Sequence, residues 1–149
     1  MRWWLALWVA GVLSGALPAA VTEAAEWKRL YTAADRSVEM DLAGIRRRGD
    51  VVLAWVKFSY DKDQSDPAKG PYRSMLQLWA YQCGLGQHAL MQFAEYSGVG
   101  GDGKVIASDA RDRYVWSYPE PDTIGEAAMK VACSRAPKTT VPNGAPTSL

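Results

Sequence analysis

The sequence predicts an α+β domain in which an antiparallel sheet of five or six strands carries one C-terminal helix on one face, tethered by a disulfide. Strand-like segments follow one another between residues 27 and 108, and they read as one-sided strands. Successive one-sided strands favour antiparallel pairing over crossover connections. After Trp116 the apolar spacing changes to that of a helix, and the two cysteines, Cys83 and Cys133, fall in a strand and in this helix.

The composition indicates one globular domain. Of the 149 residues, 48% are hydrophobic, and 17 basic against 16 acidic residues leave a formal net charge of +1. Proteins that bind nucleic acid usually present a strongly basic surface. The near balance of charge therefore argues against a nucleic-acid partner.

The first 25 residues are expected to be an export signal. Arg2 gives a positive start, residues 3–17 form an uncharged apolar run, and an alanine-rich stretch follows Pro18. A membrane-spanning helix needs roughly 20 apolar residues, so this run is too short for a permanent anchor. We expect cleavage within residues 19–25 and no stable membrane insertion afterwards. An uncleaved anchoring segment is the alternative.

The mature chain is expected to form one domain at residues 26–135, followed by a flexible tail at residues 136–149 that is rich in proline and threonine. No cysteine lies near the expected cleavage region, so this region offers no position for a lipid. The expected location is the periplasm, the cell surface or the extracellular medium.

The strands of the sheet are expected where β-branched and aromatic residues cluster. Residues 51–60 form the clearest of these segments, with alternate apolar side chains from Val52 to Tyr60 on one face. The other expected strands are residues 27–31, 38–42, 72–83, 90–97 and 104–108. Arg46 to Asp50 is expected to be a solvated turn and residues 61–71 a charged loop, while Asp102 and Gly103 are expected to supply positive dihedral angles to a hairpin.

The helix is expected at residues 124–134. Thr123 followed three residues later by Glu126 is a capping box, and Ile124, Ala128 and Val131 recur at helical spacing. Cys133 falls in the last turn of this helix.

The two cysteines are expected to be joined. In an oxidising compartment a lone pair most simply forms one disulfide, here between Cys83 and Cys133. Two reduced, buried thiols are the alternative. A redox role would call for closely spaced cysteines, and these lie far apart in the sequence.

Motifs for nucleotides and calcium match the chain only in part. Residues 98–105 have the spaced glycines of a phosphate-binding loop, but a strand follows them where a helix is needed. Asp61 and Asp63 resemble the start of a calcium loop, yet Asp66 replaces its glycine and Tyr72 its final glutamate. We expect no cofactor and no metal.

No catalytic residue is expected. His88 is the single histidine, so it has no second histidine for a metal site, and we expect it to be a surface residue of a turn. An exported hydrolase is disfavoured because no nucleophile and base pair is apparent.

Basic residues suggest a patch that binds a partner. The patch would combine the arginine run with two lysines of the charged loop, namely Arg46, Arg47, Arg48, Lys62 and Lys69. Such a patch suits an acidic polysaccharide or an acidic protein surface, and an ordinary solvated turn is the alternative. Exposed aromatic rings on a small sheet would also suit a protein-binding face, with core packing as the alternative for any one ring.

Several segments, taken in order, resemble the surface-adhesin protein E family of bacterial exported proteins. The resemblance covers roughly residues 27–133 and depends on the ordered set of motifs together with the paired cysteines. The motifs are Trp27-Lys-Arg-Leu-Tyr31, Val38-Glu-Met-Asp-Leu-Ala-Gly-Ile45, Gly49-Asp-Val-Val-Leu-Ala-Trp55, Tyr72-Arg-Ser74, Tyr96-Ser97, the stretch from Trp116 to Pro119, and the helix that ends at Cys133.

This resemblance implies an antiparallel sheet backed by a disulfide-tethered helix, and an adhesin that binds host proteins such as laminin, vitronectin or plasminogen. We therefore expect an exported, non-enzymatic module that binds a protein of the host extracellular matrix, of host plasma or of the envelope. The alternative is a periplasmic accessory or inhibitor protein that binds a bacterial envelope component. A homodimer, formed through a sheet edge or an aromatic face, stays open.

Overall fold

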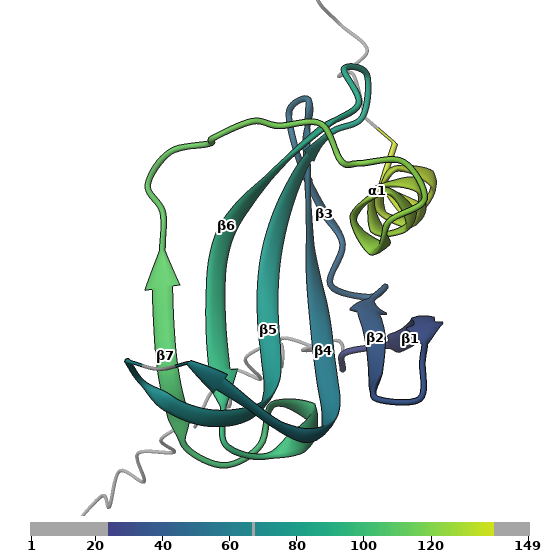
Figure 1. Ribbon diagram of the computed structural model, residues 1–149. Coiled ribbons are helices and arrows are strands. Elements are labelled where there is room, and N and C mark those ends of the chain that lie inside the picture. Colours follow the sequence, from purple (N-terminus) through teal and green to yellow (C-terminus); the bar gives the residue numbers. More distant parts are fainter. Residues whose placement is uncertain (1–23, 67, 139–149) are drawn as a thin grey trace, which may run out of the picture.

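The computed structural model describes residues 24–66 and 68–138. Most of the expected signal peptide (residues 1–25) and most of the expected tail (residues 136–149) lie outside the described residues. Within them the chain forms one antiparallel sheet and one α-helix, as the sequence predicts (Figure 1).

Seven strands make up the sheet. They are β1 (Trp27–Thr32), β2 (Arg36–Asp41), β3 (Arg46–Arg48), β4 (Val51–Asp66), β5 (Gly70–Gln82), β6 (Gln87–Tyr96) and β7 (Val105–Ala110). Their order across the sheet is β1-β2-β4-β5-β6-β7, and the short β3 pairs with the start of β4. β1 and β7 are therefore the two edges of the main sheet.

The sheet has more strand than the sequence predicts, at two places. The expected turn at Arg46 becomes β3 because its backbone pairs with residues 51–53 of β4. The expected charged loop becomes the end of a long hairpin, in which Gln64 pairs with Tyr72 after an irregularity in the register. Pairing between strands supplies hydrogen bonds that local composition does not reveal, so it overrides weak strand propensity.

The helix α1 (Ile124–Arg135) begins at the expected capping box. The Thr123 hydroxyl accepts a hydrogen bond from the amide of Glu126 at 3.3 Å, and the Glu126 carboxylate accepts one from the amide of Asp122 at 3.1 Å. These bonds satisfy amides that a helix start otherwise leaves unpaired. Among the described residues, no helix is both long and apolar enough to cross a membrane.

The core lies between α1 and one face of the sheet. Ala128 and Ala132 of the helix are buried against side chains of the central strands. Those side chains include Val38, Met40, Val52, Ala54, Val56 and Tyr81. The small side chains of Ala128 and Ala132 allow the helix to lie close to the sheet.

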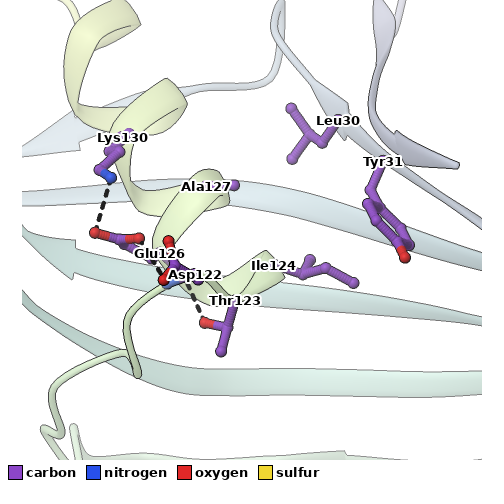
Figure 2. A pocket seen from close by; sticks show the side chains of 8 residues that line it. All are labelled: Leu30, Tyr31, Asp122, Thr123, Ile124, Glu126, Ala127 and Lys130. Carbon is purple, nitrogen blue, oxygen red and sulfur yellow. Dashed lines mark hydrogen bonds and ion pairs between the residues drawn. The ribbon is translucent and has the colours of Figure 1, made fainter.

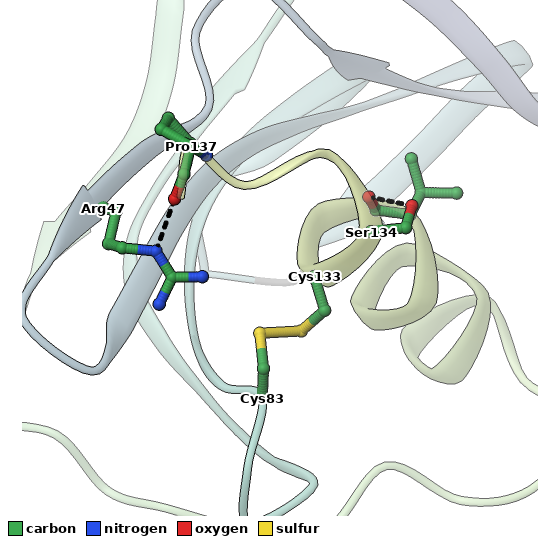
Figure 3. Close-up of a disulfide and its surroundings, with 6 residues drawn as sticks. Arg47, Cys83, Cys133, Ser134 and Pro137 are labelled. Atoms are coloured by element: carbon green, nitrogen blue, oxygen red, sulfur yellow. Dashed lines mark hydrogen bonds between the residues drawn. A yellow bond between two sulfur atoms is a disulfide. The ribbon is translucent and has the colours of Figure 1, made fainter. Parts of the chain in front are cut away.

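The predicted disulfide between Cys83 and Cys133 is confirmed (Figure 3). It joins the end of β5 to the last turn of α1, with 5.7 Å between the two Cα atoms. Beyond the helix, the guanidinium of Arg47 donates a hydrogen bond to the carbonyl of Pro137 at 2.7 Å. The C-terminal end of α1 is thus held to the sheet at two neighbouring points.

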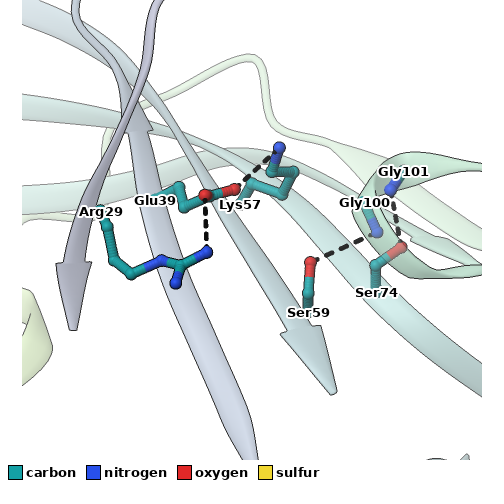
Figure 4. Close-up of polar contacts among 7 residues, drawn as sticks. All are labelled: Arg29, Glu39, Lys57, Ser59, Ser74, Gly100 and Gly101. Carbon is teal, nitrogen blue, oxygen red and sulfur yellow. Dashed lines mark hydrogen bonds and ion pairs between the residues drawn. The ribbon is translucent and has the colours of Figure 1, made fainter. Parts of the chain in front are cut away.

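The glycine-rich connection between β6 and β7 folds over the other face of the sheet. It contains the short 3-10 turn η1 (Val99–Gly101), and the amide of Gly101 donates to the buried hydroxyl of Ser74 at 2.9 Å (Figure 4). The expected hairpin is present, but Gly103 has a positive φ of 85° whereas Asp102 has a φ of −91°. The other positive dihedral angles come from Gly100 and Gly101.

Candidate protein-binding surface

A groove opens between the edge strand β1 and the first turns of α1. Its volume is about 340 Å³, and we call it the β1–α1 groove (Figure 2). Its lining side chains come from two elements and the turn between β7 and α1, namely Leu30, Tyr31, Asp122, Thr123, Ile124, Glu126, Ala127 and Lys130. More of this lining is apolar than polar.

A β-bulge in β1 builds one wall of the β1–α1 groove. The register of β1 with β2 shifts between Arg29 and Tyr31, so Leu30 is the additional residue. Side chains of a regular strand alternate between the two faces, but here the two consecutive residues Leu30 and Tyr31 both line the groove. The bulge therefore lets β1 present two neighbouring side chains toward the groove.

Charged groups lie along the helix side of the β1–α1 groove. The Glu126 carboxylate pairs with Lys130 at 2.8 Å one helical turn away. Its hydrogen bonds with Lys130 and with the amide of Asp122 lower the pKa of Glu126. The carboxylate of Asp122 makes no ion pair with any described residue. The end of the groove near the helix start therefore carries a net negative charge.

Exposed aromatic residues gather in the segment that leads from β7 to α1. We call residues 111–121 the aromatic connection. The rings of Tyr114 and Trp116 are stacked with 4.8 Å between their centroids, and Tyr118 is 70% exposed. Arg111 and Arg113 are exposed in the same segment. Tyrosine, tryptophan and arginine dominate the energetics of protein interfaces, so this composition suits a contact with another protein.

The basic residues expected to form one patch are placed at two separate ends of β4. Arg46, Arg47 and Arg48 lie on β3 beside residues 51–53, whereas Lys62 lies nine residues further along β4. At a rise of about 3.3 Å per residue this separation is on the order of 30 Å. Lys69 lies at the tip of the same hairpin, with its ammonium 5.7 Å from the ring centroid of Phe93. The three arginines share β3, but side chains of a strand alternate, so Arg47 points to the α1 face, where it bonds to Pro137, while Arg46 and Arg48 point to the opposite face. The two lysines lie apart from all three.

A charged cluster lies on the face opposite α1. Glu39 pairs with Lys57 at 2.9 Å and with Arg29 at 3.5 Å (Figure 4). The ammonium of Lys57 also lies 4.1 Å from the ring centroid of Trp27. Each charge in this cluster has a partner of opposite charge or an aromatic ring. The cluster therefore supports the sheet rather than offering free charge to a ligand.

His88 lies under the start of α1 rather than in an exposed turn. Its ring stacks on Trp79 with 4.7 Å between the ring centroids, and its Nδ1 atom is buried without a hydrogen-bond partner. Burial lowers the pKa of His88 below its ordinary value of 6.5. A cavity of about 90 Å³ beside it is lined mainly by apolar side chains, including Phe58 and Ile124.

The described residues contain no cluster suited to metal binding. No group of three or more histidine, cysteine, aspartate or glutamate side chains converges among them. The residues singled out as a partial calcium motif, Asp61 and Asp63, lie in the extended hairpin of β4.

The β1–α1 groove was not expected from the sequence. Leu30 belongs to an expected strand and Ile124 and Ala127 to the expected helix, but nothing in their spacing reveals the bulge that turns Leu30 and Tyr31 to the same side. The aromatic connection carried a signal, since residues 111–121 are rich in tyrosine, arginine and proline. Aromatic rings were expected on the sheet, where Tyr31 of β1 is exposed, but the most exposed ring among the described residues, Tyr118, lies in this connection.

Comparisons with known proteins identify one matching family and several solved structures of similar fold. The model of the family described as surface-adhesin protein E matches residues 27–134. No match to the chain is found among curated protein sequences.

Solved structures of protein E from Haemophilus influenzae are similar in fold. One is 18% identical in sequence, covers 79% of this chain and 91% of its own, and superposes with a TM-score of 0.53. A second crystal form is 17% identical, with 79% and 94% covered and a TM-score of 0.52. Protein E from a non-typeable strain is 16% identical, with 80% and 93% covered and a TM-score of 0.51. At these identities the likeness shows a shared fold.

Proposed function

The chain belongs to the surface-adhesin protein E family, and we therefore propose that it is an exported, surface adhesin-like module that binds another protein. The family match over residues 27–134 is the observation that carries the proposal. It covers every strand of the sheet and nearly all of α1, so it concerns the whole folded unit rather than one motif.

The surface of the described residues supports binding rather than catalysis. The aromatic connection exposes Tyr114, Val115 and Tyr118, with fractions between 41% and 70%. Exposed aromatic side chains next to arginines give large contact areas at low entropic cost, which favours protein recognition. Adhesin family membership likewise suggests a protein without enzymatic activity.

The partner we propose is a host protein of the extracellular matrix or plasma, of the kind represented by laminin, vitronectin and plasminogen. A second contact would involve Arg46 and Arg48, which point from β3 to the face opposite α1 and could meet an acidic surface there. Self-association through a sheet edge is compatible with the same module, since β1 and β7 are both edge strands.

Two experiments test this proposal. Intact cells are treated with external protease, and a surface adhesin should be degraded while a periplasmic marker is spared. Purified oxidised protein is then used to capture partners from host matrix and from envelope extract in parallel. Full protection from the protease, with capture from the envelope extract alone, would replace the adhesin by a periplasmic accessory or inhibitor protein.

A further inference from the structure

We propose that the β1–α1 groove binds an extended segment of a partner protein, which adds as a strand to the free edge of β1 and places one apolar side chain between β1 and α1. The inference rests on the proposed function and assigns that function a site. The segment would carry a basic residue next to its apolar one.

The first support is the position of β1 in the sheet. β1 is the last strand in the order β1-β2-β4-β5-β6-β7, and its described partner is β2. Alternate amide and carbonyl groups of an edge strand point away from the sheet and are available to another strand. An extended segment that pairs with β1 would gain main-chain hydrogen bonds without any change in the sheet.

The second support is the apolar groove directly beside this edge. Leu30 and Tyr31 from β1 face Ile124 and Ala127 from α1 across a space of about 340 Å³ (Figure 2). Tyr31 is 45% exposed although it lines the groove. Strand addition gives affinity through the backbone and specificity through pockets for alternate side chains, and this groove offers one such pocket.

The third support is charge. Asp122 lies at the groove with a carboxylate that has no ion-pair partner among the described residues, and Glu126 shares its charge with Lys130. A lysine or arginine beside the apolar anchor of the partner would meet this negative end. An acidic neighbour would be repelled, so the charge selects among apolar segments.

The bulge in β1 limits how the partner pairs. Bulges in edge strands deter continuous pairing with another chain. The register is regular at residues 27–29 and again at residues 31–32, so a partner strand would pair over a few residues rather than along a long ladder. Short pairing makes the side chain in the groove decisive for binding, and it also disfavours uncontrolled edge-to-edge aggregation.

The test uses the full-length exported protein, with its disulfide intact, against a display library of random twelve-residue peptides. The matched variants are Ala127→Trp, which fills the groove from an exposed helix position, and Ser134→Trp, which adds the same ring at an exposed position near the C-terminal end of α1. Selected peptides should share an apolar residue next to lysine or arginine. Their affinity should fall at least about tenfold in the first variant and less than about twofold in the second.

Two further measurements keep the test independent of how well the variants fold. N-methylation of alternate peptide residues leaves the protein untouched and should abolish binding if main-chain pairing is required. Hydrogen exchange should show slower exchange in residues 27–32 when the peptide is bound.

The charge of the groove is tested separately. Asp122→Asn, which suits the positive φ of 60° at that position, should weaken binding of the basic peptides about threefold or more.

Several results would overturn the inference. They are a library that yields no binders, peptides that bind Ala127→Trp as well as the unsubstituted protein, and N-methylated peptides that bind equally well. Self-association that Ala127→Trp abolishes would assign the groove to a second copy instead. If a host protein binds Ala127→Trp unchanged, the proposed function stands and its site lies elsewhere.

Discussion

At the scale of single residues, Ser74 ties the β6–β7 connection to the sheet. Its buried hydroxyl donates to the carbonyl of Gly98 at 2.6 Å and accepts from the amide of Gly101 at 2.9 Å. One side chain of β5 thus satisfies two main-chain groups of a loop that lies over the sheet without pairing with a strand at that point. The glycines allow the loop backbone to come close to the sheet, and Ser74 fixes its position there.

Ser74→Ala should therefore destabilise the protein. Two main-chain groups would lose their partner at a buried site, and each unsatisfied group costs about 1–3 kcal/mol. Ser59→Ala is the matched control, because the Ser59 hydroxyl accepts a longer bond of 3.3 Å from Gly100 in an exposed position. The free energy of unfolding in urea measures both changes. Equal losses for the two variants would contradict this role of Ser74.

His88 predicts how stability depends on pH. Burial lowers the pKa of His88 in the folded protein, while an unfolded histidine keeps a value near 6.5. Below pH 6.5 the unfolded chain takes up a proton before the folded protein does, so stability falls as the pH drops from 6.5 through the lowered pKa. Above pH 6.5 both states are neutral and this contribution is constant.

The measurement compares the free energy of unfolding at pH 7.5 and 5.5 for the unsubstituted protein and for His88→Phe. The phenylalanine keeps a ring beside Trp79 and removes the only histidine of the chain. The loss on acidification should shrink in the variant. Glu126, whose pKa is lowered from 4.5, acts below this range and does not interfere. An unchanged loss in His88→Phe would refute the assignment.

The surroundings of a residue could be predicted where they depend on its neighbours in the sequence, and could not where they depend on distant segments of the chain. The capping residues Thr123 and Glu126 make the expected bond because a helix start is a local arrangement. His88 was expected in an exposed turn, since its sequence neighbours are glycine, glutamine and alanine. Its burial results from Trp79 and the start of α1, which come from other parts of the chain.

At the scale of elements, α1 depends on the sheet. A helix of 12 residues is marginal by itself in water, so its packing and its covalent tether hold it in place. Ala128 and Ala132 supply the packing, and the disulfide fixes the last turn to the end of β5. The β1–α1 groove lies at the other end of the helix, where the capping box holds the first turn.

Replacing Cys83 and Cys133 by alanine should lower the free energy of unfolding by about 4 kcal/mol, the value that the chain-entropy model gives for a closed loop of this size. The bond spans 50 residues of sequence. Urea unfolding of the oxidised protein and the double variant measures the difference. Loss of the disulfide should also speed hydrogen exchange more at the amides of α1 than at those of β5. A variant as stable as the oxidised protein would show that packing alone holds the helix.

The helix contact gives a matched pair of substitutions. Ala132→Leu should destabilise the protein by about 1–3 kcal/mol, because a buried position against the sheet has no room for a larger side chain. Ala127→Leu, at an exposed position on another side of the same helix, should change the free energy of unfolding by less than about 0.5 kcal/mol. Thermal unfolding of the two variants checks this difference. Equal effects would mean that α1 does not pack as described.

Expected and observed elements differ where pairing decides the structure. Alternating side chains in residues 51–60 indicated a strand correctly, because burial on one face leaves a pattern in the sequence. Arg46 to Arg48 has no such pattern and still forms β3, since its backbone pairs with β4. The bulge at Leu30 likewise results from the register of β1 with β2, which a single sequence does not reveal.

At the scale of the whole molecule, the fold separates stability from recognition. The core and the disulfide lie between α1 and the central strands, whereas the β1–α1 groove and the aromatic connection lie at an edge and in a connecting segment. Loops and edges tolerate change better than a core does. This arrangement would allow the proposed binding surface to vary while the sheet and helix stay the same.

The expected fold class is confirmed, whereas the partner-binding role of the basic residues stays a prediction. Successive one-sided strands, a capping box and two cysteines sufficed for the fold, because each leaves a local pattern. The five basic residues were grouped because they are near one another in the sequence. In the fold, the three arginines lie beside the start of β4 and the two lysines lie near its other end. A surface is assembled from distant segments, so sequence spacing is a poor guide to it.

Equilibrium binding of the purified, oxidised protein to immobilised laminin, vitronectin and plasminogen tests whether this chain is an adhesin-like module. We expect saturable binding to at least one of them, competed by the same protein in solution. An unrelated exported protein of similar size and charge serves as the control. Absence of saturable binding to all three host proteins would refute an adhesin-like function for this chain.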